Sequence, residues 1–129
     1  MGIPFLLDER AHRMGVGQWV SIDYEKSPHV LWAGRTGSGK TVAAKLLLAR
    51  TILLAPPELR PVEITIIDPK EDVDFSFLAG LPHFYSGDAA PQGFNDFFEA
   101  YIQRKTGVDT TRHLKILFVD EFASLVQLI

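Results

Sequence analysis

The octapeptide Gly34-Arg35-Thr36-Gly37-Ser38-Gly39-Lys40-Thr41 matches the phosphate-loop pattern G-x-x-x-x-G-K-[ST], the Walker A motif, at each fixed position. In such a loop, successive backbone N–H groups and the N-terminus of the following helix converge on a polyphosphate. Glycines permit the tight turn and let the backbone approach the phosphate oxygens closely. We therefore expect all eight residues to bind a nucleotide, with Lys40 on the β- and γ-phosphates and the Thr41 hydroxyl on Mg²⁺.

The residues on either side of the octapeptide supply the context that a phosphate loop requires. Residues 29–33, HVLWA, predict a short buried strand, and residues 40–54 predict a helix that Pro56 and Pro57 end. A glycine-rich turn that binds nothing is the alternative interpretation. The strand before the motif and the helix after it favour a nucleotide site over that alternative.

The composition is that of a folded domain and excludes several classes of protein. The chain has 129 residues, which favours one domain, and its 13 basic residues are scattered, so a stand-alone nucleic-acid binder with a basic stripe is not indicated. The absence of cysteine excludes disulfides and cysteine-based zinc sites. No apolar run reaches the ~18 residues of a membrane span, and the first residues lack the basic region of a signal peptide.

Strand and helix patterns alternate along the rest of the chain, which predicts a parallel α/β sheet. Residues 1–17 show no regular pattern. The predicted elements are a half-exposed strand at 19–24, strands at 62–67 and 114–119, a short helix or turn at 75–78, and a helix beginning at 122. A further helix is predicted from an apolar stripe that favours a core position, formed by Phe94, Phe97, Phe98, Tyr101 and Ile102.

Residues 116–121, ILFVDE, form a second motif, four apolar strand residues followed by an acidic pair (Walker B). The pair would emerge at the carboxyl end of a parallel strand, where ligands bind in open α/β sheets. Asp120 would hold Mg²⁺, and Glu121 would orient and deprotonate an attacking water. An acidic helix N-terminus is the alternative. The phosphate loop upstream favours the ATPase interpretation, with Lys40 and Glu121 as candidate catalytic residues.

Three segments carry a family likeness: residues 27–41 with their Ser-Pro-His strand and phosphate loop, residues 66–70 (IIDPK), and residues 118–123 (FVDEFA). Together they resemble the motor domain of the FtsK/SpoIIIE family of DNA-translocating ATPases, and more loosely the coupling ATPases of conjugation. The order and spacing of the segments also agree, and the likeness covers about residues 18–127. Asp-Pro-Lys alone would indicate only a turn.

The resemblance implies a P-loop NTPase fold, a RecA-like three-layer α/β/α parallel sheet. Motor domains of this family continue with further strands after the acidic pair, so the sheet is expected to be incomplete on its C-terminal side. Residues 1–129 are then a partial P-loop ATPase domain. Within it, residues 1–27 are a lead-in with one strand, and residues 28–129 are the core between the two motifs.

The resemblance further implies the cofactors ATP and Mg²⁺, a homo-oligomeric hexameric ring and double-stranded DNA as the partner of the parent protein. Such motors act in chromosome segregation or conjugative transfer in the bacterial cytoplasm, and the parent can be membrane-anchored. Asp68 and Lys70 of the Asp-Pro-Lys segment would be auxiliary residues beside the nucleotide. A capped strand-to-turn corner is the alternative role for this pair.

Two functions remain open from the sequence. The first is the ATP-binding module of a DNA translocase, with little or no turnover by this chain alone. The alternative is a truncated, non-catalytic remnant that holds a nucleotide or serves an interaction. The intact Lys40, Thr41, Asp120 and Glu121 favour the first for the parent protein, and the few residues that follow Glu121 favour the second for this polypeptide.

Overall fold

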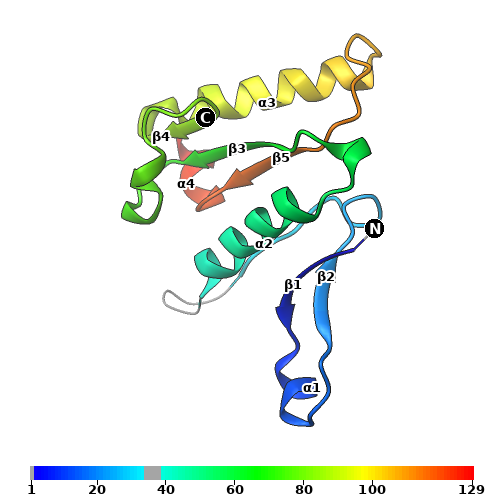
Figure 1. Ribbon diagram of the computed structural model, residues 1–129. Helices are drawn as coiled ribbons and strands as arrows, with labels where there is room; N and C mark the ends of the chain where they lie inside the picture. The colour runs from blue at the N-terminus through cyan, green and yellow to red at the C-terminus, as the bar shows by residue number, and fades with distance from the viewer. Residues whose placement is uncertain (1, 34–38) are drawn as a thin grey trace. The chain divides into compact units, whose positions relative to one another are not determined.

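The computed structural model describes residues 2–33 and 39–129, which form two compact units divided after Pro57. The first unit contains a two-stranded antiparallel sheet, and the second contains a three-stranded parallel sheet (Figure 1). Helices flank the parallel sheet, so the prediction of an α/β chain is confirmed.

The first unit opens with a β-hairpin. Strand β1 (Ile3–Leu7) pairs with β2 (Trp19–Ile22), and the short helix α1 (Glu9–Arg13) stands at the hairpin tip (blue in Figure 1). The carboxylate of Asp8 accepts a hydrogen bond of 2.8 Å from the backbone N–H of Ala11 and so caps α1. The expected strand at 19–24 is confirmed. The expectation of irregular structure before it is wrong, because β1 gains regular structure by pairing with β2.

Helix α2 (Lys40–Leu54) confirms the helix predicted after the phosphate loop, and it packs on β1. Its Thr51 is fully buried: the hydroxyl donates to the carbonyl of Leu47 at 2.7 Å and lies 2.9 Å from the Tyr24 hydroxyl. The buried core of this unit consists of Ile3, Phe5, Ile22 and Leu47. One face of α2 thus holds the helix against the hairpin.

The strand predicted at residues 29–33 is absent, and that prediction is wrong. Leu31 is 88% exposed, whereas Trp32 packs edge-on against Phe5 with 5.7 Å between ring centroids. A strand needs a neighbour for its backbone N–H and C=O groups. Among the described residues no strand pairs with this segment, so its apolar residues do not form a strand.

The second unit is built on three parallel strands in the order β4-β3-β5. Strands β3 (Glu63–Asp68) and β5 (Lys115–Val119) confirm the two predicted strands to within one residue. Strand β4 (Phe84–Ser86) was not predicted, because three residues are too few to show an alternating pattern. Strand β5 forms one edge of the described sheet.

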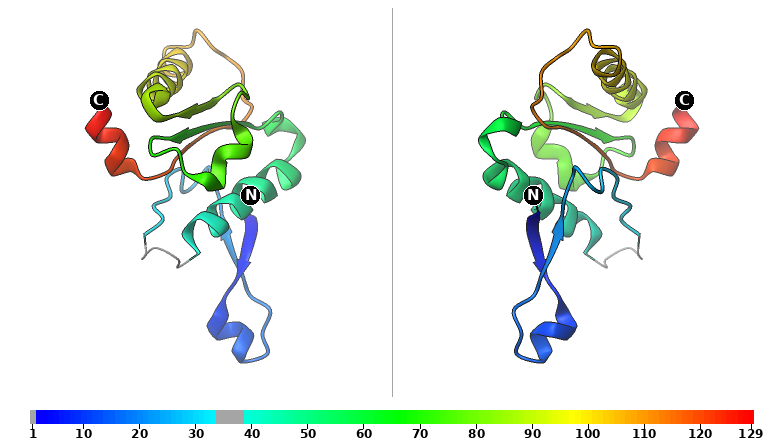
Figure 2. Two further views of the ribbon diagram at one scale, coloured as in Figure 1. Left: turned by 90° about the vertical axis from the view of Figure 1, so that its left-hand side faces the viewer. Right: turned by 90° about the vertical axis from the view of Figure 1, so that its right-hand side faces the viewer.

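Helices α3 (Ala90–Lys105) and α4 (Phe122–Leu128) contact each other, and α3 runs along β3 and β4 (Figure 2). On this face the fully buried residues are Ile67, Ala90 and Leu125, with Phe94, Leu117 and Val119 packed against them. Phe118 alternates with its neighbours along β5 and therefore faces the other side. There it meets Phe75, which comes from the 3₁₀ helix η2 (Val73–Leu78).

The aromatic stripe of α3 is only partly a core stripe. Phe98 and Tyr101 are about half exposed and stack on each other with centroids 6.2 Å apart, so the prediction that they are core residues is wrong. The buried positions of α3 are instead small: Ala90 and Gly93. A Cβ at Gly93 would come within 2.5 Å of the Tyr85 ring. Small residues let the helix approach β4 closely, and of the larger residues in the stripe Phe94 packs against the core cluster of this face.

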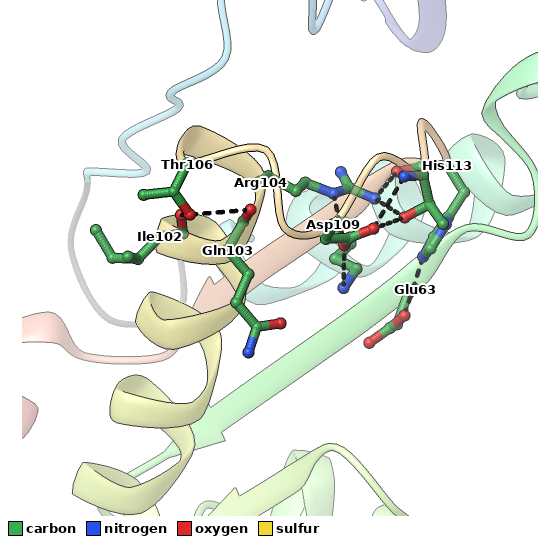
Figure 3. Close-up of polar contacts among 9 residues, drawn as sticks. Glu63, Ile102, Gln103, Arg104, Thr106, Asp109 and His113 are labelled. Atoms are coloured by element: carbon green, nitrogen blue, oxygen red, sulfur yellow. Dashed lines mark hydrogen bonds and ion pairs between the residues drawn. The ribbon is translucent and has the colours of Figure 1, made fainter.

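A polar cluster ties the end of α3 to the start of β5 (Figure 3). The Arg104 guanidinium donates to the carbonyl of His113 at 2.7 Å and lies 3.4 Å from the Asp109 carboxylate. Asp109 also accepts hydrogen bonds from the Thr111 hydroxyl and backbone N–H, and these bonds, with Arg104 and Lys115 nearby, lower the pKa of Asp109 to about 2. Arg104 therefore holds the segment between α3 and β5 against the end of α3.

Replacement of Asp109 by asparagine is expected to lower the thermal stability of the chain at pH 7. Because the folded-state pKa of Asp109 lies below the ordinary 3.8, its stabilising effect is present above about pH 4 and is lost as the pH falls through 2. Circular dichroism melts from pH 7 to pH 2 measure the difference between wild type and variant. The difference in melting temperature between wild type and Asp109→Asn should shrink as the pH falls. The exposed control Asp88→Asn should show little change at any pH. If the difference for Asp109→Asn persists unchanged to pH 2, the charge of Asp109 does not stabilise the fold.

Candidate nucleotide site

The phosphate-loop residues Gly34, Arg35, Thr36, Gly37 and Ser38 lie outside the described residues. The structure describes the last three residues of the octapeptide. Gly39 has a left-handed backbone, with φ 90° and ψ 12°, and Lys40 begins α2. The N-cap residue Gly39 has no side chain that could cap the helix, and the first turn of α2 carries no acidic residue. The first-turn N–H groups and Lys40 are therefore suited to an anion such as a phosphate group.

In the second unit, the carboxyl ends of β3 and β5 bring acidic residues together. Ile67 pairs with Val119 in the parallel register, and the N–H of Asp120 donates to the carbonyl of Ile67 at 2.9 Å. Asp68, the last residue of β3, and Asp120, the first residue after β5, therefore occupy neighbouring positions at one edge of the sheet. Ligands of open α/β sheets bind at such an edge.

Asp68 is an unusual carboxylate because it is 1% exposed. Its Oδ1 has no hydrogen-bond partner among the described residues. Burial raises the pKa of Asp68, and the nearby charges of Asp72 and Glu71 act in the same direction, while backbone N–H groups of the following turn partly offset them. A buried oxygen without a partner indicates that this end of the sheet is suited to a further ligand.

Asp120 is in a similar environment. Burial raises its pKa, and the charges of Asp68, Asp72, Glu121 and Asp74 raise it further. A cation would relieve this accumulated negative charge, and carboxylate oxygens are ligands that Mg²⁺ prefers. Over residues 2–33 and 39–129, no three histidine, aspartate or glutamate side chains converge on a metal geometry. The acidic residues fit a Mg²⁺ ion that takes its other ligands from phosphate and water, as Mg²⁺ usually does.

Glu121 follows Asp120 at the junction of β5 and α4. Its backbone is left-handed, with φ 55° and ψ 72°. Its carboxylate Oε2 lies 2.8 Å from Lys70 Nζ and accepts a hydrogen bond of 3.3 Å from the Ser124 hydroxyl. Sequence reasoning missed Ser124 altogether. The contact with Lys70 follows from the pairing of β3 with β5, because both residues come just after the carboxyl ends of these strands.

The structure thus gathers four of the predicted site residues in one place: Asp68, Lys70, Asp120 and Glu121. Lys40 and Thr41 stand at the start of α2, in the other unit. A helix that begins at a phosphate-loop lysine, and parallel strands that end in carboxylates, are features typical of P-loop nucleotide-binding proteins.

The chain belongs to the FtsK/SpoIIIE family, whose sequence pattern matches residues 6–104. This membership implies the P-loop fold. It also confirms the family resemblance. The matched residues include two of the three sequence segments, residues 27–41 and 66–70, and end before the third, residues 118–123.

Individual relatives agree with this membership. The DNA translocase FtsK 2 of Neisseria meningitidis is 42% identical over 67 residues, which cover 52% of this chain and 6% of the relative. The DNA translocase FtsK of Mesorhizobium japonicum is 44% identical over 68 residues, 52% of this chain and 7% of the relative. The DNA translocase FtsK of Chlamydia muridarum is 36% identical over 81 residues, which cover 63% of this chain and 9% of the relative. The matched part is thus less than a tenth of these relatives.

No solved structure gives a significant match to the chain. Within the described part of the chain, none of the helices combines the length and the apolar character needed to span a membrane.

Proposed function

We propose that this chain is the ATP-binding module of a double-stranded DNA translocase. The observation that carries the proposal is the grouping of Asp68, Lys70, Asp120 and Glu121 at the carboxyl ends of β3 and β5, in a member of the FtsK/SpoIIIE family. Relatives that match this chain are named DNA translocases. The proposal includes a RecA-like three-layer fold, a hexameric ring and DNA pumping in chromosome segregation or conjugation.

Each site residue has a role in this proposal. The octapeptide backbone and Lys40 bind the phosphates of ATP, and Thr41 and Asp120 hold Mg²⁺, which neutralises phosphate charge when bound. Glu121 orients a water molecule for attack on the γ-phosphorus and accepts its proton, and ADP and inorganic phosphate are the products. Asp68 adds negative charge beside Asp120, and Lys70 contacts Glu121.

Turnover by this chain alone is expected to be slow. P-loop ATPases commonly need an arginine from a neighbouring subunit, which accelerates related reactions by ~10³–10⁵. Binding is therefore a more direct test of the proposal than hydrolysis.

Calorimetric titration of the chain with ATP is expected to give saturable binding in the presence of Mg²⁺ and weaker binding with a chelator. AMP is the matched control ligand, because it lacks the β- and γ-phosphates that the loop recognises. We expect AMP to bind far more weakly than ATP. If a chain that melts cooperatively shows equal heats with ATP and AMP, or none with either, the proposal is wrong.

A further inference from the structure

The contact between Lys70 and Glu121 joins two segments that are distant in sequence. Lys70 lies just after the end of β3 and Glu121 just after the end of β5, and their charged atoms are 2.8 Å apart. Both side chains are more than half exposed. Exposed ion pairs contribute little to folding stability. The role of this pair therefore needs an explanation other than stability.

The backbone of Glu121 suggests a role for the ion pair. Residues other than glycine seldom adopt positive φ, and such a conformation persists only where the surroundings hold it. At Glu121 the backbone N–H of Ser124 donates to the carbonyl at 2.9 Å, while the Ser124 hydroxyl and Lys70 bind the carboxylate. Contacts on both sides thus fix this residue where β5 turns into α4.

The negative charge around Glu121 explains why a positively charged lysine contacts its carboxylate. Five other carboxylates act on this end of the sheet, namely Asp68, Glu71, Asp72, Asp74 and Asp120. Their repulsion would drive an unpaired Glu121 side chain away from the sheet edge. Lysine is protonated at neutral pH at its ordinary pKa, and the hydrogen bond and charge of Glu121 raise the pKa of Lys70 further. The positive charge of Lys70 therefore opposes this repulsion.

We propose that Lys70 is a positioning residue for Glu121: its ammonium holds the carboxylate at the shared end of β3 and β5. Only the consequence for catalysis rests on the proposed function, in which Glu121 accepts the proton of the attacking water. In that case Lys70 sets where the base stands before the water arrives. The positional claim itself concerns this chain without any nucleotide.

The experiment compares the ¹³C side-chain signals of Glu121 and the amide signal of Ser124 by NMR in four proteins: wild type, Lys70→Met, Lys70→Arg and Lys105→Met. Lys105 is the matched control, an exposed lysine of the same unit at the end of α3. We expect Lys70→Met to move both sets of signals without changing Tm. Lys70→Arg should largely restore them, because arginine keeps the charge and the donor, and Lys105→Met should leave them in place.

The proposal is overturned if the Glu121 signals in Lys70→Met coincide with those of wild type. It is also overturned if arginine fails to restore them. Should Lys70→Met fail to fold, Glu121→Gln tests the same contact from the other side. In that variant the pKa of the Lys70 ammonium, followed by its ε-methylene ¹³C shift, should fall toward the ordinary 10.5; an unchanged pKa contradicts the contact.

Titration with MgATP separates this proposal from the proposed function. Lys70→Met should bind MgATP as wild type does, because Lys70 acts on Glu121. A loss of about tenfold or more in affinity would make Lys70 a phosphate ligand and overturn the positioning role. If wild type itself binds no MgATP, the proposed function fails, while the Glu121 signals still decide whether Lys70 positions that residue.

Discussion

Replacement of Lys40 by alanine is expected to remove most of the affinity of the chain for MgATP. Lys40 is the first residue of α2, and in a phosphate loop the lysine ammonium and the first-turn N–H groups bind the same anion. Removal of one partner from a desolvated charge pair costs about 2–5 kcal/mol, which corresponds to a rise in Kd of about 30-fold or more. Calorimetric titration of both proteins measures this change.

The fold should survive this substitution, since alanine is the best helix former and suits the first turn of α2. Both tryptophans, Trp19 and Trp32, lie in the same unit as Lys40, so their fluorescence reports whether that unit is intact. Lys26→Ala is the matched control, an exposed lysine of the same unit that should bind MgATP as wild type does. Equal affinity in Lys40→Ala and Lys26→Ala would mean that the octapeptide is not a phosphate site.

The second large effect is expected from Phe75→Ala, which should lower the free energy of unfolding of the second unit by about 3–5 kcal/mol. Phe75 is 1% exposed and packs against Phe118 of β5 with 5.6 Å between ring centroids. The substitution removes a large buried ring and leaves a cavity beneath the strand that leads to Asp120 and Glu121. Native proteins are stable by only about 5–15 kcal/mol, so this loss is severe.

Hydrogen exchange at the amides of β3 and β5 measures this loss within the second unit, where tryptophan fluorescence gives no signal. Phe77→Ala is the matched control: it removes the same ring from the same 3₁₀ helix, but Phe77 is 72% exposed. Its effect should be about 1 kcal/mol or less. Similar losses in the two variants would show that Phe75 is not a core residue of this sheet.

The sequence shows which residues form the candidate site, but it does not show how these residues are arranged in space. The octapeptide and the acidic pair are short motifs whose chemistry follows from residue type and spacing, so Lys40, Thr41, Asp120 and Glu121 could be named from the sequence. The proximity of Lys70 to Glu121 depends on β3 and β5 being neighbours in register, a long-range pairing that no local pattern contains. The contact of Ser124 depends on the left-handed turn at Glu121.

Local patterns were sufficient for α2, β3 and β5, because Pro56 and Pro57 mark the end of the helix and each strand is a largely apolar run that ends at an aspartate. They failed wherever a neighbour sets the conformation. Residues 3–7 became a strand because β2 pairs with them, and residues 29–33 did not, because no described strand does. Phe98 and Tyr101 are about half exposed although Phe94 of the same stripe packs against the core, so the helical period alone does not show which members of the stripe are buried. Strand pairing and close packing join residues far apart in the chain, so they arise only when the chain has folded.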